Sequence, residues 1–241
     1  MKIIEILNGV VKKFGLTEKA EVKSRYENNQ ISADFVQELC PVGEKTTFQD
    51  VNFIPSKKFV TPKKIEPGMF YYIDGLIFPE LIPGNQVSAI VGGVGMNYGL
   101  AIGLRETVLP WSSDRLYVDM SLGVSGKEAT SLILEAAKKM QKNAEAAEWC
   151  AKYTFRGIKA GTGFMPSKEE LRCMFANRKK LCQSFALCNS GVLSGDAFYW
   201  ASSEYHGNDY TAWDVRPSDG LLFHHVKSDS YRVLCAVEFR I

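Results

Sequence analysis

The sequence predicts an α+β protein, because two helical segments interrupt a series of short strands. Short apolar and aromatic runs separated by turn residues begin at residue 69, as is typical of strands. Two segments with helical composition follow between residues 126 and 180, and short aromatic runs then continue to the C-terminus. Because the helices stand together between two groups of strands, the order favours an α+β fold with antiparallel strands.

Residues 1–68 are predicted to form a small, mainly helical attachment or oligomerisation segment and a linker. The first forty residues have helical character, and Thr17 is a suitable N-cap. Residues 41–68 are rich in proline and show little periodicity, which is typical of a linker, although two short apolar pieces within them are also compatible with edge strands. The main domain is therefore expected at 69–241.

The first strands of this domain are predicted to form two pairs. Residues 69–78, MFYYIDGLIF, place two apolar runs around Asp74-Gly75, a dipeptide that favours the tight turn of a β-hairpin. Residues 87–95 and 98–104 predict a second pair. The glycines between them lack a following Lys-Ser/Thr and the spacing of the dinucleotide fingerprint, so we assign them to strand turns rather than to phosphate binding.

Two helices are expected next. Residues 126–153 are rich in Ala, Glu and Lys, with apolar positions at helical spacing, and predict one long helix. A second helix is predicted to begin after Ser167 and to run to about Lys180, with Ser167 and Glu170 spaced as a reciprocal capping box. Four short strands are then expected in the pieces FYWASS, TAWDVR, GLLFHHV and RVLCAVEFRI.

Composition excludes several classes of function. The chain carries 29 basic and 27 acidic residues, with the basic pairs scattered, so no nucleic-acid partner is expected. No segment approaches the roughly 20 apolar residues of a membrane helix, and the N-terminus lacks the features of a secretory signal peptide. We therefore expect synthesis in the cytoplasm, with any surface role reached as a virion component or through a dedicated export route.

The six cysteines show neither a CxxC pair nor the Cys/His spacing of a zinc site. Buried free thiols are the default expectation for such a chain. We expect no metal and no cofactor.

Five pieces in sequence order resemble a known family. They are AAEWC, GTGFMPSKEELRCMF, YWASSEY, TAWDVRPSDG and YRVLCAVEF, and they are similar to the C-type-lectin-like domains of bacteria and phages. These include the C-terminal domain of collagen-like adhesins and the variable proteins of diversity-generating retroelements. The match covers about residues 69–241. It implies a C-type-lectin-like fold of two helices with short antiparallel strands, acting as a ligand-binding domain.

Two features depart from related lectins. The Glu-Pro-Asn, Gln-Pro-Asp and Trp-Asn-Asp motifs of calcium-dependent sugar binding do not occur, so the resemblance does not imply metal-assisted sugar binding. Cys150 and Cys235 occupy positions where secreted relatives carry a disulfide. We expect these two residues to be neighbours, as thiols or as a disulfide.

Residues 205–231 are dense in Tyr, His, Asn, Asp and Ser, a composition that suits adaptable recognition surfaces. The resemblance suggests that adenine-directed mutagenesis diversified this stretch, while a generic polar loop explains the composition equally well. The ligand would be a cell-surface protein or glycan, and the sequence does not choose between them. The predicted ligand-binding residues are Tyr205, His206, Asn208, Asp209, Tyr210, Asp214, Arg216, Ser218, Asp219, Phe223, His225, Ser228 and Tyr231.

Strand alternation makes further predictions within this stretch. Trp213 and Val215 should be buried, while Asp214 and Arg216 should face the ligand, and Trp200 and Trp213 should anchor the core. Adjacent His224 and His225 should point to opposite faces, so a shared metal is not expected. The carboxylates are interpreted as surface groups rather than as an acid–base pair; they are Glu204, Asp209, Asp214 and Asp219.

The functional hypothesis is a non-enzymatic receptor-recognition protein. Its setting would be a retroelement-diversified adhesin at a phage or prophage tail tip, with the N-terminal segment forming a homo-oligomer. One alternative is an enzyme of the formylglycine-generating type, which would use Cys182 and Cys188. However, Lys179 and Lys180 lie at the C-terminal end of the predicted helix, where the helix dipole does not activate a thiol. The other alternative is a structural oligomer subunit.

Overall fold

The α+β class is confirmed by the computed structural model, which describes residues 59–118, 120, 123–191, 193 and 197–241. Most of the predicted N-terminal segment, with its expected helices and oligomer contact, lies outside these residues. The part from residue 59 to 68 contacts the sheet: Ile77 donates its backbone N–H to Thr61 Oγ1 at 3.0 Å, and Phe59 packs edge-on against Phe78.

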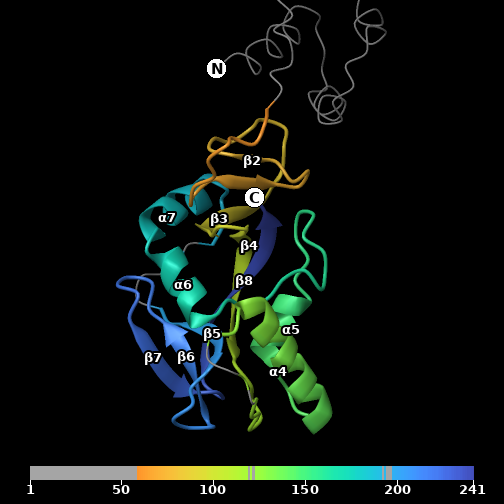
Figure 1. Ribbon diagram of the computed structural model, residues 1–241, viewed down its shortest axis with the longest axis vertical. Helices are drawn as coiled ribbons and strands as arrows, with labels where there is room; N and C mark the ends of the chain where they lie inside the picture. The colour runs from red at the N-terminus through yellow and green to blue at the C-terminus, as the bar shows by residue number, and fades with distance from the viewer. Residues whose placement is uncertain (1–58, 119, 121–122, 192, 194–196) are drawn as a thin grey trace, which may run out of the picture. The chain divides into compact units, whose positions relative to one another are not determined.

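The described residues form one eight-stranded sheet in the order β2-β1-β3-β4-β8-β5-β6-β7 (Figure 1). Neighbouring strands are antiparallel, except that β5 and β8 are parallel at Tyr199 and Arg232. The strands are β1 (Phe70–Tyr72), β2 (Ile77–Phe78), β3 (Val87–Val94), β4 (Tyr98–Pro110), β5 (Tyr199–Glu204), β6 (Thr211–Val215), β7 (Leu222–Val226) and β8 (Ser230–Arg240).

The predicted strand pairs are confirmed. The β1–β2 hairpin turns at Gly75, whose φ of 84° is the left-handed conformation that favours glycine. Strands β3 and β4 pair as expected, but β4 continues to Pro110. Its second half has no strong apolar pattern and is held in the sheet by pairing with β8, as at Leu109 and Tyr231.

The prediction of one helix over 126–153 was wrong. The chain forms α4 (Gly126–Met140) and α5 (Glu145–Ala151), separated by a turn in which Gln141 has a φ of 54°. Asn143 donates its backbone N–H to Asp114 Oδ2 at 2.8 Å. Helix propensity is continuous through this segment, but the tertiary bond to Asp114 and the burial of Ala144 redirect the chain.

The next helix begins as predicted and ends early. Helix α6 (Lys168–Phe175) has the full capping box between Ser167 and Glu170. It stops at Ala176, well before Lys180, and a separate helix α7 (Arg178–Leu187) follows. The described residues thus contain four helices where two were expected.

The helices cover both faces of the sheet. Ala89, Val91 and Ala101 belong to the core cluster that contains Ile133 of α4 and Ala147 of α5. Their chain neighbours Ile90, Leu100 and Ile102 belong to the second cluster, with Leu171 and Phe175 of α6 and Leu181 and Phe185 of α7. Because successive residues of a strand point to opposite faces, α4 and α5 pack on one face and α6 and α7 on the other.

The prediction that Cys150 and Cys235 are neighbours is confirmed. Cys150 Sγ lies 3.4 Å from the carbonyl oxygen of Leu234, and Cys235 Sγ lies 3.6 Å from that of Cys150. Both are free thiols and fully buried between α5 and β8. Burial raises the pKa of Cys150, and the nearby Cys235 raises it further.

Glu170 joins the starts of two helices and provides a test of the fold. Its carboxylate accepts from the N–H of Ser167 at 2.8 Å and from that of Gly126 at 3.2 Å. Glu170→Ala leaves two sheltered amides without an acceptor and should lower the free energy of unfolding by about 1–3 kcal/mol. The matched control is Glu169→Ala, whose side chain is 59% exposed and which should change stability by less than about 0.5 kcal/mol. Urea unfolding measures both, and equal effects would contradict this role.

Candidate ligand-binding surface

The predicted site residues on β6 and β7 are divided between the two faces of this strand pair. Trp213 lies opposite His224, whereas Asp214 lies opposite Phe223 and Ala212 opposite His225. Side chains opposite one another share a face. The expected separation of His224 and His225 is therefore confirmed, with His224 exposed and His225 half-buried.

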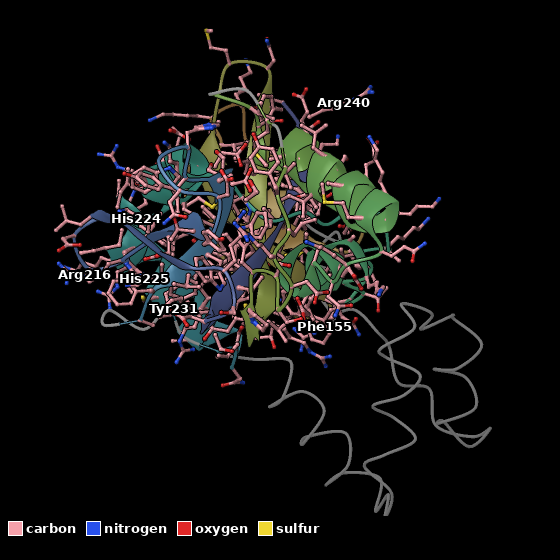
Figure 2. The ribbon with its side chains drawn as sticks, turned by 90° about the horizontal axis from the view of Figure 1, so that it is seen from below. Phe155, Arg216, His224, His225, Tyr231 and Arg240 are labelled. Carbon is pink, nitrogen blue, oxygen red and sulfur yellow. The ribbon has the colours of Figure 1, made fainter. Side chains whose placement is uncertain are left out.

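One face carries four half-exposed rings, Phe198, Phe223, His225 and Tyr231, which we call the aromatic face. The centroid of Phe198 lies 5.1 Å from Phe223, 5.1 Å from His225 and 5.6 Å from Tyr231. His225 and Tyr231 are 4.8 Å apart. Figure 2 shows His225 and Tyr231 close together at one side of the molecule. Phe198, which precedes β5 and offers no polar signal in the sequence, was not among the predicted residues.

The aromatic face rests on buried groups. The indole of Trp200, fully buried as predicted, packs edge-on against Tyr231 at 5.0 Å and donates to the carbonyl of Leu109 at 3.1 Å. At the edge of the face, the Arg216 guanidinium lies 5.1 Å from the centre of the Phe223 ring. Trp200 and Phe198 thus hold the neighbouring rings of this surface in place by packing against them.

The prediction that Asp214 faces the ligand beside Arg216 was wrong. Asp214 is 0% exposed, because β6 is an interior strand and Trp200 of β5 lies directly opposite it. Trp213, expected in the core with Val215, is only half-buried. The simple alternation assumed one open face for β6, whereas neighbouring elements cover parts of both.

Asp214 instead orients His225. Asp214 Oδ2 and His225 Nδ1 lie 2.6 Å apart, so the imidazole is held with its other nitrogen, Nε2, directed away from the carboxylate. Asp214 Oδ1 is buried without a hydrogen-bond partner among the described residues. Burial raises the pKa of Asp214, and the bond with His225 acts in the opposite direction. The pair of Asp214 and His225 therefore gives the aromatic face one polar group in a fixed orientation.

The opposite face of β6 and β7 holds a second set of rings. Tyr205 and His224 are stacked with centroids 3.9 Å apart, and Trp213 meets Tyr205 edge-on at 5.0 Å. The Lys168 ammonium at the start of α6 lies 4.6 Å from the centre of the Trp213 ring. Part of the surface of each of these side chains is therefore already in contact with the others.

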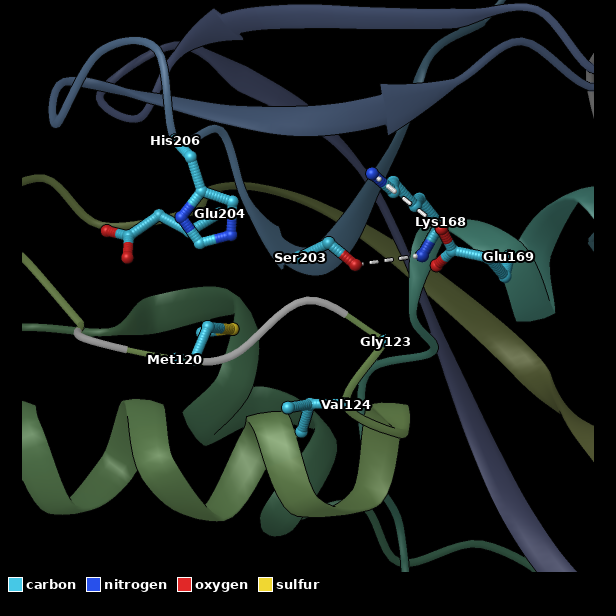
Figure 3. Close-up of a pocket in the computed structure, with 8 residues that line it drawn as sticks. All are labelled: Met120, Gly123, Val124, Lys168, Glu169, Ser203, Glu204 and His206. Carbon is cyan, nitrogen blue, oxygen red and sulfur yellow. Dashed lines mark hydrogen bonds and ion pairs between the residues drawn. The ribbon is translucent and has the colours of Figure 1, made fainter.

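A small pocket adjoins this second set (Figure 3). Its volume of about 20 Å³ holds about one water molecule. The lining residues are Met120, Gly123, Val124, Lys168, Glu169, Ser203, Glu204 and His206. The pocket is too small for an organic cofactor or a sugar ring.

The remaining predicted residues lie in connecting loops. The turn between β6 and β7 is closed by Arg216, whose Nε donates to Asp219 Oδ1 at 3.1 Å, and this hydrogen bond lowers the pKa of Asp219. The other loop residues are all exposed: His206, Asn208, Asp209 and Tyr210 before β6, Ser218 in the β6–β7 turn, and Ser228 after β7. The thirteen predicted residues therefore form two faces and three loops rather than one surface.

A buried ion pair, which the sequence analysis missed, holds these loops. Lys227 Nζ bonds to Glu204 Oε1, to the carbonyl of Leu116 at 2.7 Å and to that of Asp209 at 2.8 Å. Both side chains are only 3% exposed, so the interpretation of Glu204 as a surface carboxylate was wrong. Burial lowers the pKa of Lys227 and raises that of Glu204, in each case against the attraction of the partner. The available signal was that Lys227 is the one lysine within 205–231.

The thiols of the enzymatic alternative lie elsewhere. Cys182 and Cys188 are half-buried, and Cys182 Sγ lies 3.8 Å from the carbonyl of Leu193. Burial raises the pKa of Cys188, which is opposite to the shift of an activated thiol. Among the residues that the structure describes, no cluster of three His, Cys, Asp or Glu side chains could hold a metal, and no helix is long and apolar enough to cross a membrane.

Comparison with known proteins shows similarity of fold to a solved structure but shows no family. No family model and no curated protein matches the chain. Among solved structures, it is similar to a fimbrial protein from Bacteroides ovatus ATCC 8483, with a TM-score of 0.56 and 16% sequence identity. The similarity covers 73% of this chain and 49% of that one, so this chain spans about half the length of the fimbrial protein. At this identity the likeness concerns the fold alone.

Removing Lys227 should be strongly destabilising. Lys227→Met leaves the buried Glu204 carboxylate without its cation, although it still accepts a hydrogen bond from the backbone N–H of Val118, and should lower the free energy of unfolding by about 3–5 kcal/mol. Adding Glu204→Gln removes the stranded charge and should restore part of the loss.

Urea unfolding measures the free energy of unfolding of the wild type, of both single variants, Lys227→Met and Glu204→Gln, and of the double variant. The control is Lys127→Met, which breaks an exposed pair with Glu238 and should cost no more than about 1 kcal/mol. A loss at Lys227 as small as that at Lys127 would refute the structural role of the buried pair.

Proposed function

We propose that this protein is a non-enzymatic receptor-recognition protein with a C-type-lectin-like domain, which binds its ligand through the aromatic face. The observation that carries the proposal is the packing of Phe198, Phe223, His225 and Tyr231 into one half-exposed surface beside the fully buried Asp214. Buried carboxylates are costly unless paired, and this one fixes a surface imidazole.

The chemistry of the aromatic face suits a ligand with both apolar and polar groups. Aromatic side chains offer large contact area with few rotatable bonds, so little entropy is lost on binding. His225 Nε2 can exchange a hydrogen bond with the ligand, and the Arg216 guanidinium lies beside the rings. A cell-surface protein or glycan provides such groups, because both combine apolar patches with hydroxyl, amide or carboxylate groups.

The comparisons support the general class of this proposal. A fold shared with a fimbrial protein agrees with a role at a surface, while the C-type-lectin-like assignment rests on the five sequence pieces given above. Burial raises the pKa of Cys188, which does not favour its activation as a thiolate.

The setting we propose is a phage or prophage tail tip with a retroelement-diversified face. This predicts a near-identical template repeat downstream of the gene that differs from the coding copy at adenines, with a reverse-transcriptase gene beside it. The differing codons should include those of Phe223, His225 and Tyr231. Sequencing the flanking DNA tests this, and finding no such repeat would leave an undiversified binding domain.

Binding through the aromatic face predicts a specific pattern of mutant affinities. The labelled full chain would be screened on an array of bacterial glycans and purified cell-surface proteins, and each hit titrated with variants. Phe223→Ala should weaken binding by about tenfold or more, as truncation of a central aromatic contact does. Tyr98→Ala, at the opposite end of β4 from the strand segment that pairs beside Tyr231, should leave it unchanged.

Tyr205→Ala provides the discriminating measurement, because Tyr205 lies on the opposite face with His224. A loss of affinity in Tyr205→Ala together with unchanged affinity in Phe223→Ala would overturn the assignment to the aromatic face.

A further inference from the structure

Strand β7 forms an open edge of the sheet. It is last in the strand order, and β6 is its one strand neighbour within the described part of the chain. The other end of the sheet is different, because β2 has only two residues and the N–H of Ile77 is taken by Thr61. An edge strand exposes backbone groups on which another strand can pair.

The register shows which backbone groups face outward. Arg216 donates its N–H to the carbonyl of Leu221, and Lys227 donates to that of Tyr210. Since hydrogen-bonded pairs alternate along an antiparallel ladder, Phe223 and His225 bond to β6. The N–H and C=O groups of Leu222, His224 and Val226 therefore point away from β6, toward the open edge.

This edge lacks the protection that natural sheets use. Its pairing with β6 runs through five consecutive residue pairs without a bulge, and its sequence, LFHHV, contains neither lysine nor proline. Val226 is 46% exposed and the preceding Leu221 is 51% exposed. Lys227, which follows β7, is directed inward to Glu204. Isolated edges usually carry a charge, a proline or a bulge that prevents pairing, so this one is suited to a partner strand.

We propose that β7 pairs antiparallel with β7 of a second copy of this chain, about a twofold axis beside His224. In this register Leu222 lies opposite Val226 of the partner subunit, and Phe223 lies opposite His225 of the partner subunit. Apolar residues thus meet apolar residues and rings meet rings. A twofold contact requires a self-complementary surface, and LFHHV meets that requirement with no acidic, lysine or arginine side chain in the strand.

The proposed pairing extends the proposed function, because it joins the binding surfaces of two copies of the domain. Phe223 and His225 belong to the aromatic face, so the twofold axis places the aromatic faces of both copies on one side of a continuous sheet. The two binding surfaces then act together on a ligand that repeats, such as a polymer or a crowded surface.

Hydrogen exchange of the full chain tests the pairing directly, because it reports on β7 independently of contacts made elsewhere in the chain. As protein concentration rises, the exchange rate of the outward amides of Leu222, His224 and Val226 should fall by at least about tenfold. The inward amides of Phe223 and His225 should stay protected at every concentration. Val226→Lys places a charge on the edge and should abolish this dependence. Val108→Lys, at a residue 55% exposed on β4, is the matched control and should retain it.

Two results would overturn the proposal. One is exchange of the outward amides at a rate that does not depend on protein concentration, whether fast or slow. The other is the same concentration dependence in Val226→Lys as in the wild type. Neither result bears on the Phe223→Ala titration, so failure of the pairing and failure of ligand binding are distinguishable.

Discussion

The ion pair between Lys227 and Glu204 sets the geometry on which the rest of the C-terminal region depends. One ammonium joins the end of β5, the loop before β6, the turn after β7 and the segment at Leu116. A buried pair contributes little net stability, because desolvation offsets the attraction. The pair nevertheless constrains the structure, since either charge buried without its partner would be strongly unfavourable. The loops are thereby restricted to the arrangement in which both charges are matched.

Asp214 acts by the same principle on a smaller scale. Its burial is unfavourable for the carboxylate, and the contact with His225 is the compensation that the strand pair provides. The imidazole is consequently fixed in a surface made otherwise of Phe198, Phe223 and Tyr231. Fixed rings lose little freedom when a ligand binds, so a small surface of this kind retains more of its contact energy as affinity.

The sequence was informative where structure is local. The turn at Gly75 and the capping box of Ser167 and Glu170 depend on residues within a few positions of each other, and both were predicted. Gln141 ends α4 against its helical propensity because the following turn bonds to Asp114, about thirty residues away. Burial of Asp214 was missed because it depends on which strands flank β6. Lateral order in a sheet is a long-range property that periodicity within one strand does not contain.

Strand β7 contributes both to the aromatic face and to the open edge of the sheet. This double use restricts how the surface can vary. In β7 the side chains of Phe223 and His225 lie on the aromatic face while their backbone groups bond to β6. The intervening Leu222, His224 and Val226 direct their backbone groups to the open edge. Substitutions on the aromatic face therefore change ring chemistry without removing a backbone donor from the edge. Under the proposed pairing, Phe223 and His225 also meet across the twofold axis, so a ring substitution changes both the aromatic face and the side-chain packing between the two copies, while the backbone pairing is kept.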